Sequence, residues 1–169
     1  FRHVPFGNGG ISGDQDVHLS AHPGWHTTAM GWSIVPWGLR KLLRWIDARY
    51  GHPPIVITEN GCAFPDVPAR GVIDDTRRIE FLDAYLSEAH RAIDEGVDLR
   101  GYFLWSLMDN FEWSSGFTRR FGLWHVDYAT GARTPKSSAA WFSRLVADNG
   151  FIPMTGNPYR SVAGEEGHD

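Results

Sequence analysis

The sequence predicts an α/β fold with parallel strands, and it predicts that the chain holds only part of such a fold. Apolar residues recur at helical spacing near residues 37–50, 75–95 and 137–147. Two short, continuously apolar runs between them, at 54–58 and 101–107, are typical of strands buried on both faces. Helices that alternate with strands indicate parallel strands joined by crossovers. Two such strands cannot cover each other's open edges, so further strands are expected beyond these 169 residues.

The first helix and strand follow from local signals. The helix stops at Gly51 and Pro53, and its apolar stripe is Leu39, Leu42, Leu43, Ile46 and Tyr50. Residues 54–58 are apolar and rich in β-branched side chains, as a buried strand requires. Residues 1–27 contain many Gly, Pro and His residues without a sustained period, so they are expected to form a loop.

The second half repeats the pattern. Asp74 or Asp75 is expected to cap a helix that ends at Gly96, with the stripe Ile79, Leu82, Leu86, Ala89 and Ile93. The second strand precedes a loop with a small hairpin, near Phe117 and Trp124–Tyr128. The last helix has Trp141, Phe142, Leu145 and Val146 as its apolar face, and residues 149–169 are expected to form a flexible tail. Trp45, Trp124 and Trp141 are expected in the core.

Composition excludes several classes of function. A net charge of −4 without a basic cluster argues against a nucleic-acid partner, and no apolar run reaches the ~20 residues of a membrane span. Cys62 is the only cysteine, so an intrachain disulfide and a four-cysteine zinc site are excluded. With no signal-peptide pattern in the sequence, a cytoplasmic setting is expected. His18, His22 and His26 are spaced by four, but Pro23 and Gly24 would break the helix needed for a metal site.

Both predicted strands end in carboxylates. Glu59 follows the first apolar run, and Asp109 and Glu112 follow the second. In a β/α barrel, the carboxyl ends of the strands carry the active site. A buried ion pair or a loop-capping carboxylate would explain Glu59 as well, and the pattern alone leaves these alternatives open.

Several motifs resemble glycoside hydrolase family 1. Residues 57–61, Ile-Thr-Glu-Asn-Gly, resemble the nucleophile motif of that family, and residues 105–113 resemble its strand-eight sugar-binding motif. Further similarity lies at 30–36, 75–79, 120–123, 125–128 and 133–136, so that it extends over residues 28–147 in one order. The resemblance implies that residues 1–169 form a partial barrel domain. This domain would be the C-terminal part of a TIM (β/α)8 barrel, from the region after strand six through strands seven and eight.

The resemblance also implies roles for individual residues. Glu59 would be the nucleophile of a retaining β-glucosidase and would form a covalent glycosyl-enzyme. Glu112 would accept hydrogen bonds from the C4 and C6 hydroxyls, and Trp113 would donate one near the C3 hydroxyl. Trp105 would stack on the sugar, Phe121 would line the same pocket, and Trp32 would flank the leaving-group subsite. The neighbouring residues Asn60, Asp109 and Asn110 are expected to be structural.

One required group is missing from the sequence. The acid/base of the family is a Glu in an Asn-Glu-Pro motif, and no such motif occurs here. We therefore expect hydrolysis of cellobiose or of aryl and alkyl β-glucosides only in a complete parent protein, and an inactive isolated chain. The selectivity among glucose, galactose and fucose stays open. Two alternatives are a non-catalytic sugar-binding fragment and one part of a split enzyme, completed by the missing N-terminal part of the barrel. No metal or organic cofactor is implied.

Overall fold

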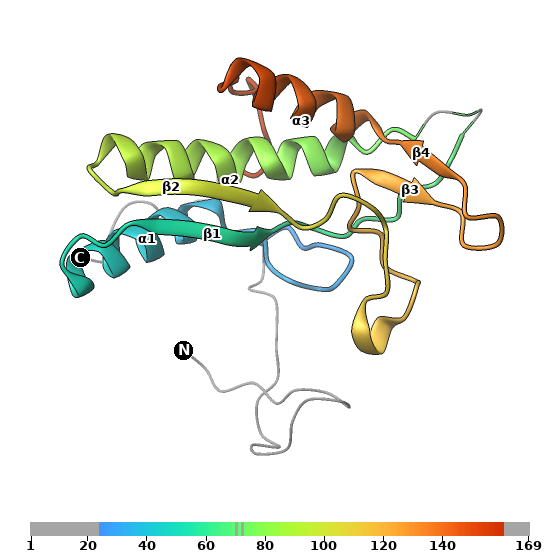
Figure 1. Cartoon of the computed structure of the whole chain (residues 1–169), viewed down its shortest axis with the longest axis horizontal. Coiled ribbons are helices and arrows are strands. Elements are labelled where there is room, and N and C mark those ends of the chain that lie inside the picture. The colour runs from blue at the N-terminus through green and yellow to red at the C-terminus, as the bar shows by residue number, and fades with distance from the viewer. Residues whose placement is uncertain (1–23, 70, 72, 161–169) are drawn as a thin grey trace.

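The computed structural model describes residues 24–69, 71 and 73–160. Its helices and strands alternate as the sequence predicts (Figure 1), and the boundaries move by a few residues. The elements are α1 (Pro36–Tyr50), β1 (Ile55–Asn60), α2 (Thr76–Asp94), β2 (Leu99–Leu104), the 3₁₀ turn η1 (Trp113–Ser115), β3 (Trp124–Val126), β4 (Arg133–Pro135) and α3 (Ser137–Asp148). None of the described helices is long and apolar enough to cross a bilayer.

The strands β1 and β2 pair in parallel. Ile57 lies opposite Tyr102, and Asn60 lies opposite Leu104. Both strands therefore end at the same edge of the sheet (Figure 1). Beyond that edge, β3 and β4 form an antiparallel hairpin, and Met108 forms a parallel bridge with Trp124 that ties the hairpin to the loop after β2.

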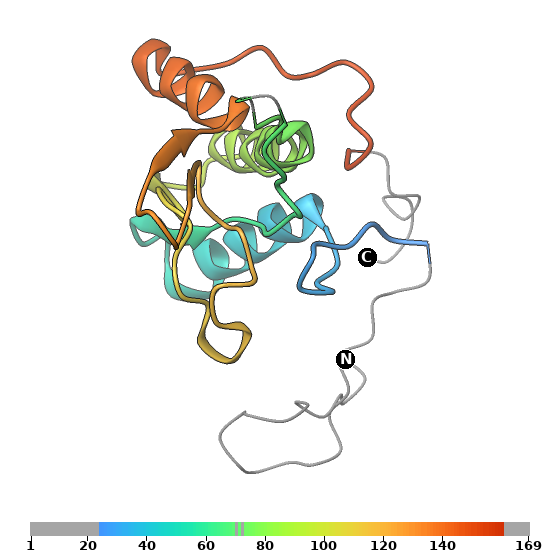
Figure 2. The ribbon, with the colours of Figure 1, turned by 90° about the vertical axis from the view of Figure 1, so that its right-hand side faces the viewer.

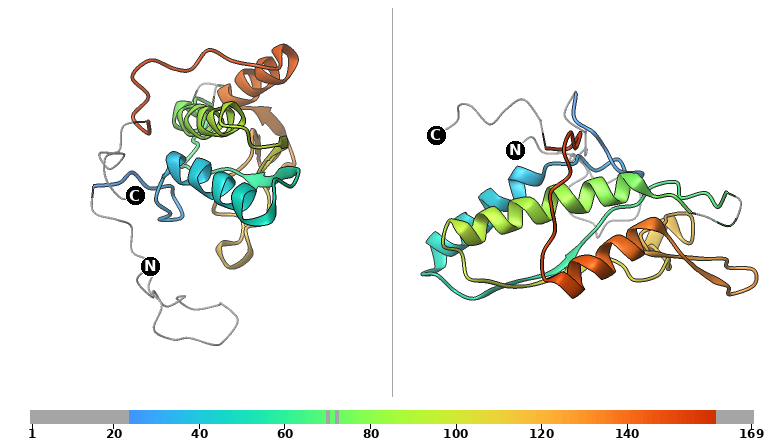
Figure 3. Two further views of the ribbon diagram at one scale, coloured as in Figure 1. Left: turned by 90° about the vertical axis from the view of Figure 1, so that its left-hand side faces the viewer. Right: turned by 90° about the horizontal axis from the view of Figure 1, so that it is seen from above.

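The helix α2 lies at the centre of the helical layer, with α1 on one side and α3 on the other (Figure 3). Phe81, Leu82 and Ala84 of α2 belong to one core cluster, and Ala92 joins a second cluster with Leu43 of α1. The predicted apolar stripe is too narrow for this arrangement. Because α2 is covered from several directions, polar residues such as Arg78, Asp83 and Glu88 are buried on it. Ile93, which belongs to the predicted stripe, is exposed.

The outer face of the sheet is open. Val56 of β1 is 47% exposed and Phe103 of β2 is 62% exposed. The prediction that both strands are buried on both faces is therefore wrong for this chain by itself. The helices cover one face, and no described residue covers these side chains on the other. Trp45 and Trp124 are also exposed rather than in the core, although Trp141 packs against the main cluster.

The segment after α3 differs from the expected flexible tail over its described residues. Asn157 and Tyr159 are buried, and the segment runs back across α2 (Figure 3). Asn157 Nδ2 donates hydrogen bonds to the Asp83 carboxylate at 2.6 Å and to the Glu80 carbonyl at 2.8 Å. These contacts fix residues 154–160 on the helix. Residues 161–169 and most of the predicted N-terminal loop, with His18 and His22, lie outside the described residues.

Candidate active site

A cavity of about 440 Å³ opens at the edge where β1 and β2 end. Figure 2 looks onto this edge and shows the loops that follow the two strands. The lining residues come from β1, from the loop after β2, from the segment before α1 and from α2: Thr28, Trp32, Ser33, Glu59, Asn60, Gly61, Phe81, Tyr85, Trp105, Glu112, Trp113 and Phe121. The predicted nucleophile and all five predicted sugar-binding residues therefore meet in one cavity. Asp109 and Asn110 do not line it.

The end of β1 positions Glu59. Its neighbour Asn60 is fixed twice, because its carbonyl accepts a hydrogen bond from Trp105 N at 3.0 Å and its side-chain oxygen accepts one from Tyr102 Oη at 2.6 Å. Burial raises the pKa of Tyr102 well above its ordinary value, so the phenol remains a donor. The strands approach each other so closely after Asn60 that a Cβ on Gly61 would lie 1.7 Å from the Trp105 carbonyl oxygen. Only glycine fits there.

Two tight turns shape the loop after β2. Ser106 Oγ donates to the Met108 carbonyl at 2.9 Å, and Asn110 Nδ2 donates to Ser106 Oγ at 2.9 Å. Further along, Glu112 N donates to the Gly116 carbonyl at 2.7 Å, which closes the turn that contains η1. This turn leaves Glu112 half-buried and Trp113 82% exposed, and both residues line the cavity.

The buried carboxylate of Asp109 holds the base of the same loop. Its Oδ1 accepts a hydrogen bond from Gly122 N at 2.9 Å, and its Oδ2 accepts one from Arg120 Nη1 at 3.2 Å. Phe121, between these two donors, is buried in the cavity wall with its ring centroid 6.0 Å from that of Trp32. Asp109 therefore fixes where this aromatic wall stands.

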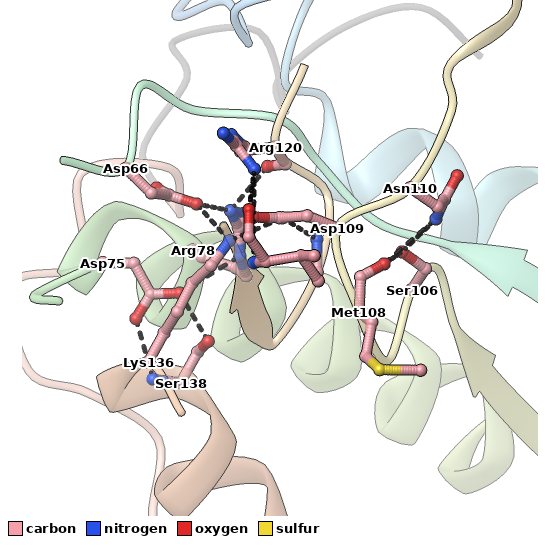
Figure 4. Close-up of polar contacts among 12 residues, drawn as sticks. Asp66, Asp75, Arg78, Ser106, Met108, Asp109, Asn110, Arg120, Lys136 and Ser138 are labelled. Carbon is pink, nitrogen blue, oxygen red and sulfur yellow. Dashed lines mark hydrogen bonds and ion pairs between the residues drawn. The ribbon is translucent and has the colours of Figure 1, made fainter. Parts of the chain in front are cut away.

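A cluster of buried charges joins the loops that follow β1 and β2 to α2 and to the segment before α3 (Figure 4). We call it the buried charge network, and its members are Asp66, Asp75, Arg78, Asp109, Arg120 and Lys136. Asp75 occupies the predicted N-cap of α2, but its side chain accepts hydrogen bonds from Ser138 N and Oγ instead of capping the helix. Burial raises the pKa of Asp75, although the bonds from Ser138 oppose the shift.

Sequence reasoning missed this network and part of the cavity lining. Phe81 and Tyr85 line the cavity as a stacked pair with ring centroids 4.2 Å apart, and Tyr85 Oη accepts a hydrogen bond from Val35 N at 3.0 Å. Their spacing of four residues on a helix is a usable signal, but the apolar pattern predicts a different core stripe, which includes Leu82 and Leu86. Asp75 and Arg78 are three residues apart, but the pairs that Lys136 makes with Asp66 and Asp109 join distant segments, so no local pattern predicts them.

The chemistry available in the cavity is that of carboxylates and aromatic rings. Glu59 and Glu112 are the carboxylates among the lining residues, and Trp32, Trp105 and Trp113 supply flat apolar faces. Within residues 24–69, 71 and 73–160, no group of three or more His, Cys, Asp or Glu residues could hold a metal ion. A ligand with hydroxyl edges and apolar faces, such as a sugar ring, suits this lining.

Comparisons with known proteins agree on one family. The sequence model of glycosyl hydrolase family 1 matches residues 8–151. β-Glucosidase A of Acetivibrio thermocellus is 51% identical over 125 residues, which cover 73% of this chain and 28% of that protein. A bifunctional β-D-glucosidase/β-D-fucosidase of Bifidobacterium breve is 46% identical over 142 residues, which cover 81% of this chain and 31% of that protein.

Solved structures give the same result. The family 1 β-glucosidase of Thermotoga maritima superposes with a TM-score of 0.76 at 46% identity, over 78% of this chain and 30% of that chain. The same enzyme has been solved in complex with glucoimidazole. This chain therefore spans less than a third of the length of these relatives.

Proposed function

The chain belongs to glycosyl hydrolase family 1, and from this we propose that it is the nucleophile-bearing, C-terminal part of a retaining β-glucosidase. Relatives named as β-glucosidases support hydrolysis of β-glucosides as the activity of the complete protein. The observation that carries the proposal is the position of Glu59. Glu59 is the last residue but one of β1, and it lines the same cavity as Glu112 and the tryptophans.

In the proposed reaction, a Glu59 carboxylate oxygen attacks the anomeric carbon. The bond from that carbon to the leaving-group oxygen breaks, and an ester to Glu59 forms with inverted configuration. A water molecule then attacks the same carbon, the ester bond breaks, and the sugar leaves with its original configuration. The acid/base carboxyl protonates the leaving oxygen in the first step and removes a proton from the water in the second. It lies ~5–5.5 Å from the nucleophile in such enzymes.

Recognition of the sugar is assigned to the loop after β2. Glu112 accepts hydrogen bonds from the C4 and C6 hydroxyls, Trp113 donates near the C3 hydroxyl, and Trp105 stacks on the ring. Phe121 completes this subsite, and Trp32 flanks the leaving group. The shared cavity supports these roles. Bonds to a charged acceptor are stronger than neutral ones, and a sugar that lacks one of these hydroxyls leaves an acceptor of Glu112 unpaired.

The open surface of the sheet supports a place within a larger barrel. We assign β1 and β2 as barrel strands seven and eight, preceded by the segment after strand six. The exposed side chains of Val56 and Phe103 would then be covered by the remaining strands. Because the sequence contains no Asn-Glu-Pro motif, the rest of the barrel must supply the acid/base. A general acid contributes ~10²–10⁴ in rate, so the isolated chain is inactive.

The test uses a chimera, called here the complete enzyme, in which this chain replaces the matching segment of β-glucosidase A from Acetivibrio thermocellus. The complete enzyme hydrolyses 4-nitrophenyl β-glucoside, and the isolated chain does not. Glu59→Gln lowers kcat/KM by about 10⁴-fold or more, because it removes the nucleophile. Glu95→Gln is the matched control and leaves kcat/KM unchanged, because Glu95 lies at the C-terminal end of α2 and does not line the cavity. A Glu59→Gln enzyme within tenfold of the unmodified one would refute the role of Glu59.

A further inference from the structure

Two buried cations connect the loops that follow β1 and β2. Lys136 Nζ lies 2.6 Å from Asp66 Oδ2, in the loop after β1, and 2.9 Å from Asp109 Oδ1, in the loop after β2. All three side chains are almost completely buried, and they are drawn in Figure 4. Lys136 thus joins the loop that follows the nucleophile to the loop that carries Glu112.

Arg78 of α2 makes a second connection. Its Nη1 donates to the Cys62 carbonyl at 2.9 Å, three residues after Glu59. Its Nη2 donates to the Arg120 carbonyl at 2.8 Å, next to Phe121, and it also pairs with Asp66. The two loops are therefore held together by Arg78 and Lys136.

Asp109 closes the base of the second loop. It lies three residues before Glu112, and its carboxylate binds Gly122 N, the residue after Phe121. The approach at this point is tight, since a Cβ on Gly122 would lie 2.1 Å from Asp109 N. The orientation of the part of the loop that carries Glu112 and Trp113 therefore depends on these contacts of Asp109.

Stability alone is a weak reason for such a network. Burying charges costs desolvation, and well-packed apolar residues are often as stable as the ion pairs they replace. A network of three carboxylates and three cations does, however, define one geometry, because every charge must keep its partner.

We propose that Asp109 and Lys136 are positioning residues for sugar recognition, because the buried charge network sets where the loop carrying Glu112, Trp113 and Phe121 stands relative to Glu59. This inference rests on the proposed function. Its consequence is selective: when the network is broken, recognition of the C6 hydroxyl by Glu112 weakens more than attack by Glu59.

The experiment measures selectivity in the complete enzyme. The readout is the ratio of kcat/KM for 4-nitrophenyl β-glucoside to kcat/KM for its 6-deoxy analogue. A variant that only reduces the folded fraction lowers both values equally and leaves the ratio unchanged. In the unmodified enzyme the ratio is about 100-fold, as expected for the loss of one hydrogen bond to a charged acceptor. Asp109→Asn and Lys136→Met each lower it by about tenfold.

Asp83→Asn is the matched control. Asp83 is equally buried, and its carboxylate accepts hydrogen bonds from Met154 N at 2.9 Å and Asn157 Nδ2 at 2.6 Å, with Arg160 at 3.1 Å. These bonds fix the C-terminal segment and not the loop after β2. We expect this variant to lose stability and to keep the selectivity ratio within about twofold.

A milder variant covers the case in which the buried substitutions do not fold. Arg120, whose side chain is 22% exposed, binds Asp109 from the edge of the network, and Arg120→Met lowers the ratio by about threefold. An unchanged ratio in the folded variants would overturn the inference, as would an equal loss in Asp83→Asn. An unmodified complete enzyme that hydrolyses neither substrate would overturn the proposed function itself.

Discussion

Replacement of Gly61 by alanine tests the close approach of β1 and β2 beside the nucleophile. The added Cβ would lie 1.7 Å from the Trp105 carbonyl oxygen, whereas an ordinary contact begins at 3.4 Å. The obstacle is backbone, so no side-chain rotation relieves it. The chain at Gly61 and the chain at Trp105 must separate by about 1.7 Å, and the hydrogen bond from Trp105 N to the Asn60 carbonyl is stretched with them.

The expected loss follows from that displacement. Glu59 lies two residues before Gly61, and Trp105 lines the same cavity, so the nucleophile moves relative to the sugar. A misplacement of about 1 Å costs about 10²-fold in rate. We therefore expect Gly61→Ala to lower kcat/KM of the complete enzyme by at least about 100-fold, calculated per active site. The active sites are counted from the total leaving group released on complete inactivation by a 2-deoxy-2-fluoro-β-glucoside.

Gly150→Ala is the matched control. An added Cβ at Gly150 would meet only the Asp148 carbonyl oxygen at 3.8 Å, and this glycine has no positive φ. Its kcat/KM is expected to stay within about twofold of the unmodified enzyme. If Gly61→Ala behaves like Gly150→Ala, the close contact between the strand ends does not position Glu59, and the reasoning is refuted.

Three further predictions concern the buried and charged groups. Arg78→Met leaves the buried Asp75 without its cation and leaves Asp66 with Lys136 alone, so it should destabilise the complete enzyme by about 3–5 kcal/mol, seen as a lower urea midpoint. Arg100→Met, at an exposed pair, should not shift that midpoint. Burial raises the pKa of Cys62 to about 12, so its thiol should not react with Ellman's reagent at pH 8 in the folded complete enzyme whose other cysteines are replaced. The thiol should react in guanidinium, and equal reactivity in both conditions would contradict its burial. Burial and the nearby positive charge of Arg120 lower the pKa of His125, so the contribution of His125 to the free energy of unfolding should fall as the pH drops below about 6.5. An NMR titration midpoint of His125 at or above about 6.5 would contradict the lowered pKa.

Local signals in the sequence were sufficient for the order of the elements. Gly51 and Pro53 end α1 close to where the pattern indicates, and the β-branched residues after them form β1. The exposure of the sheet was not predictable in the same way, because an apolar side chain such as Phe103 has the same sequence pattern whether or not another strand covers it. The contacts of Asn157 with α2 were missed because they join residues more than 70 positions apart.

The candidate site, like the fold, could be predicted from the sequence only in part. The strand pattern indicates that Glu59 and Asp109 follow strands, but the separate roles expected for them come from the motif resemblance. The structure places Glu59 in the cavity lining and Asp109 in the buried charge network. The partners of Asp109 could not be predicted, since Lys136 lies 27 residues away in another element and the pairing exists only in the folded chain.

Covalent labelling tests the central claim most directly. The complete enzyme is incubated with a 2-deoxy-2-fluoro-β-glucoside that carries a good leaving group, and the protein is then analysed by intact mass spectrometry and peptide mapping. The fluorine slows both steps, while the good leaving group makes the first step fast, so the glycosyl-enzyme accumulates. We predict one sugar adduct per chain, on the peptide that contains Glu59, and none in Glu59→Gln. An adduct on Glu112, or an active enzyme that forms no adduct, would contradict the assignment of Glu59 as the nucleophile.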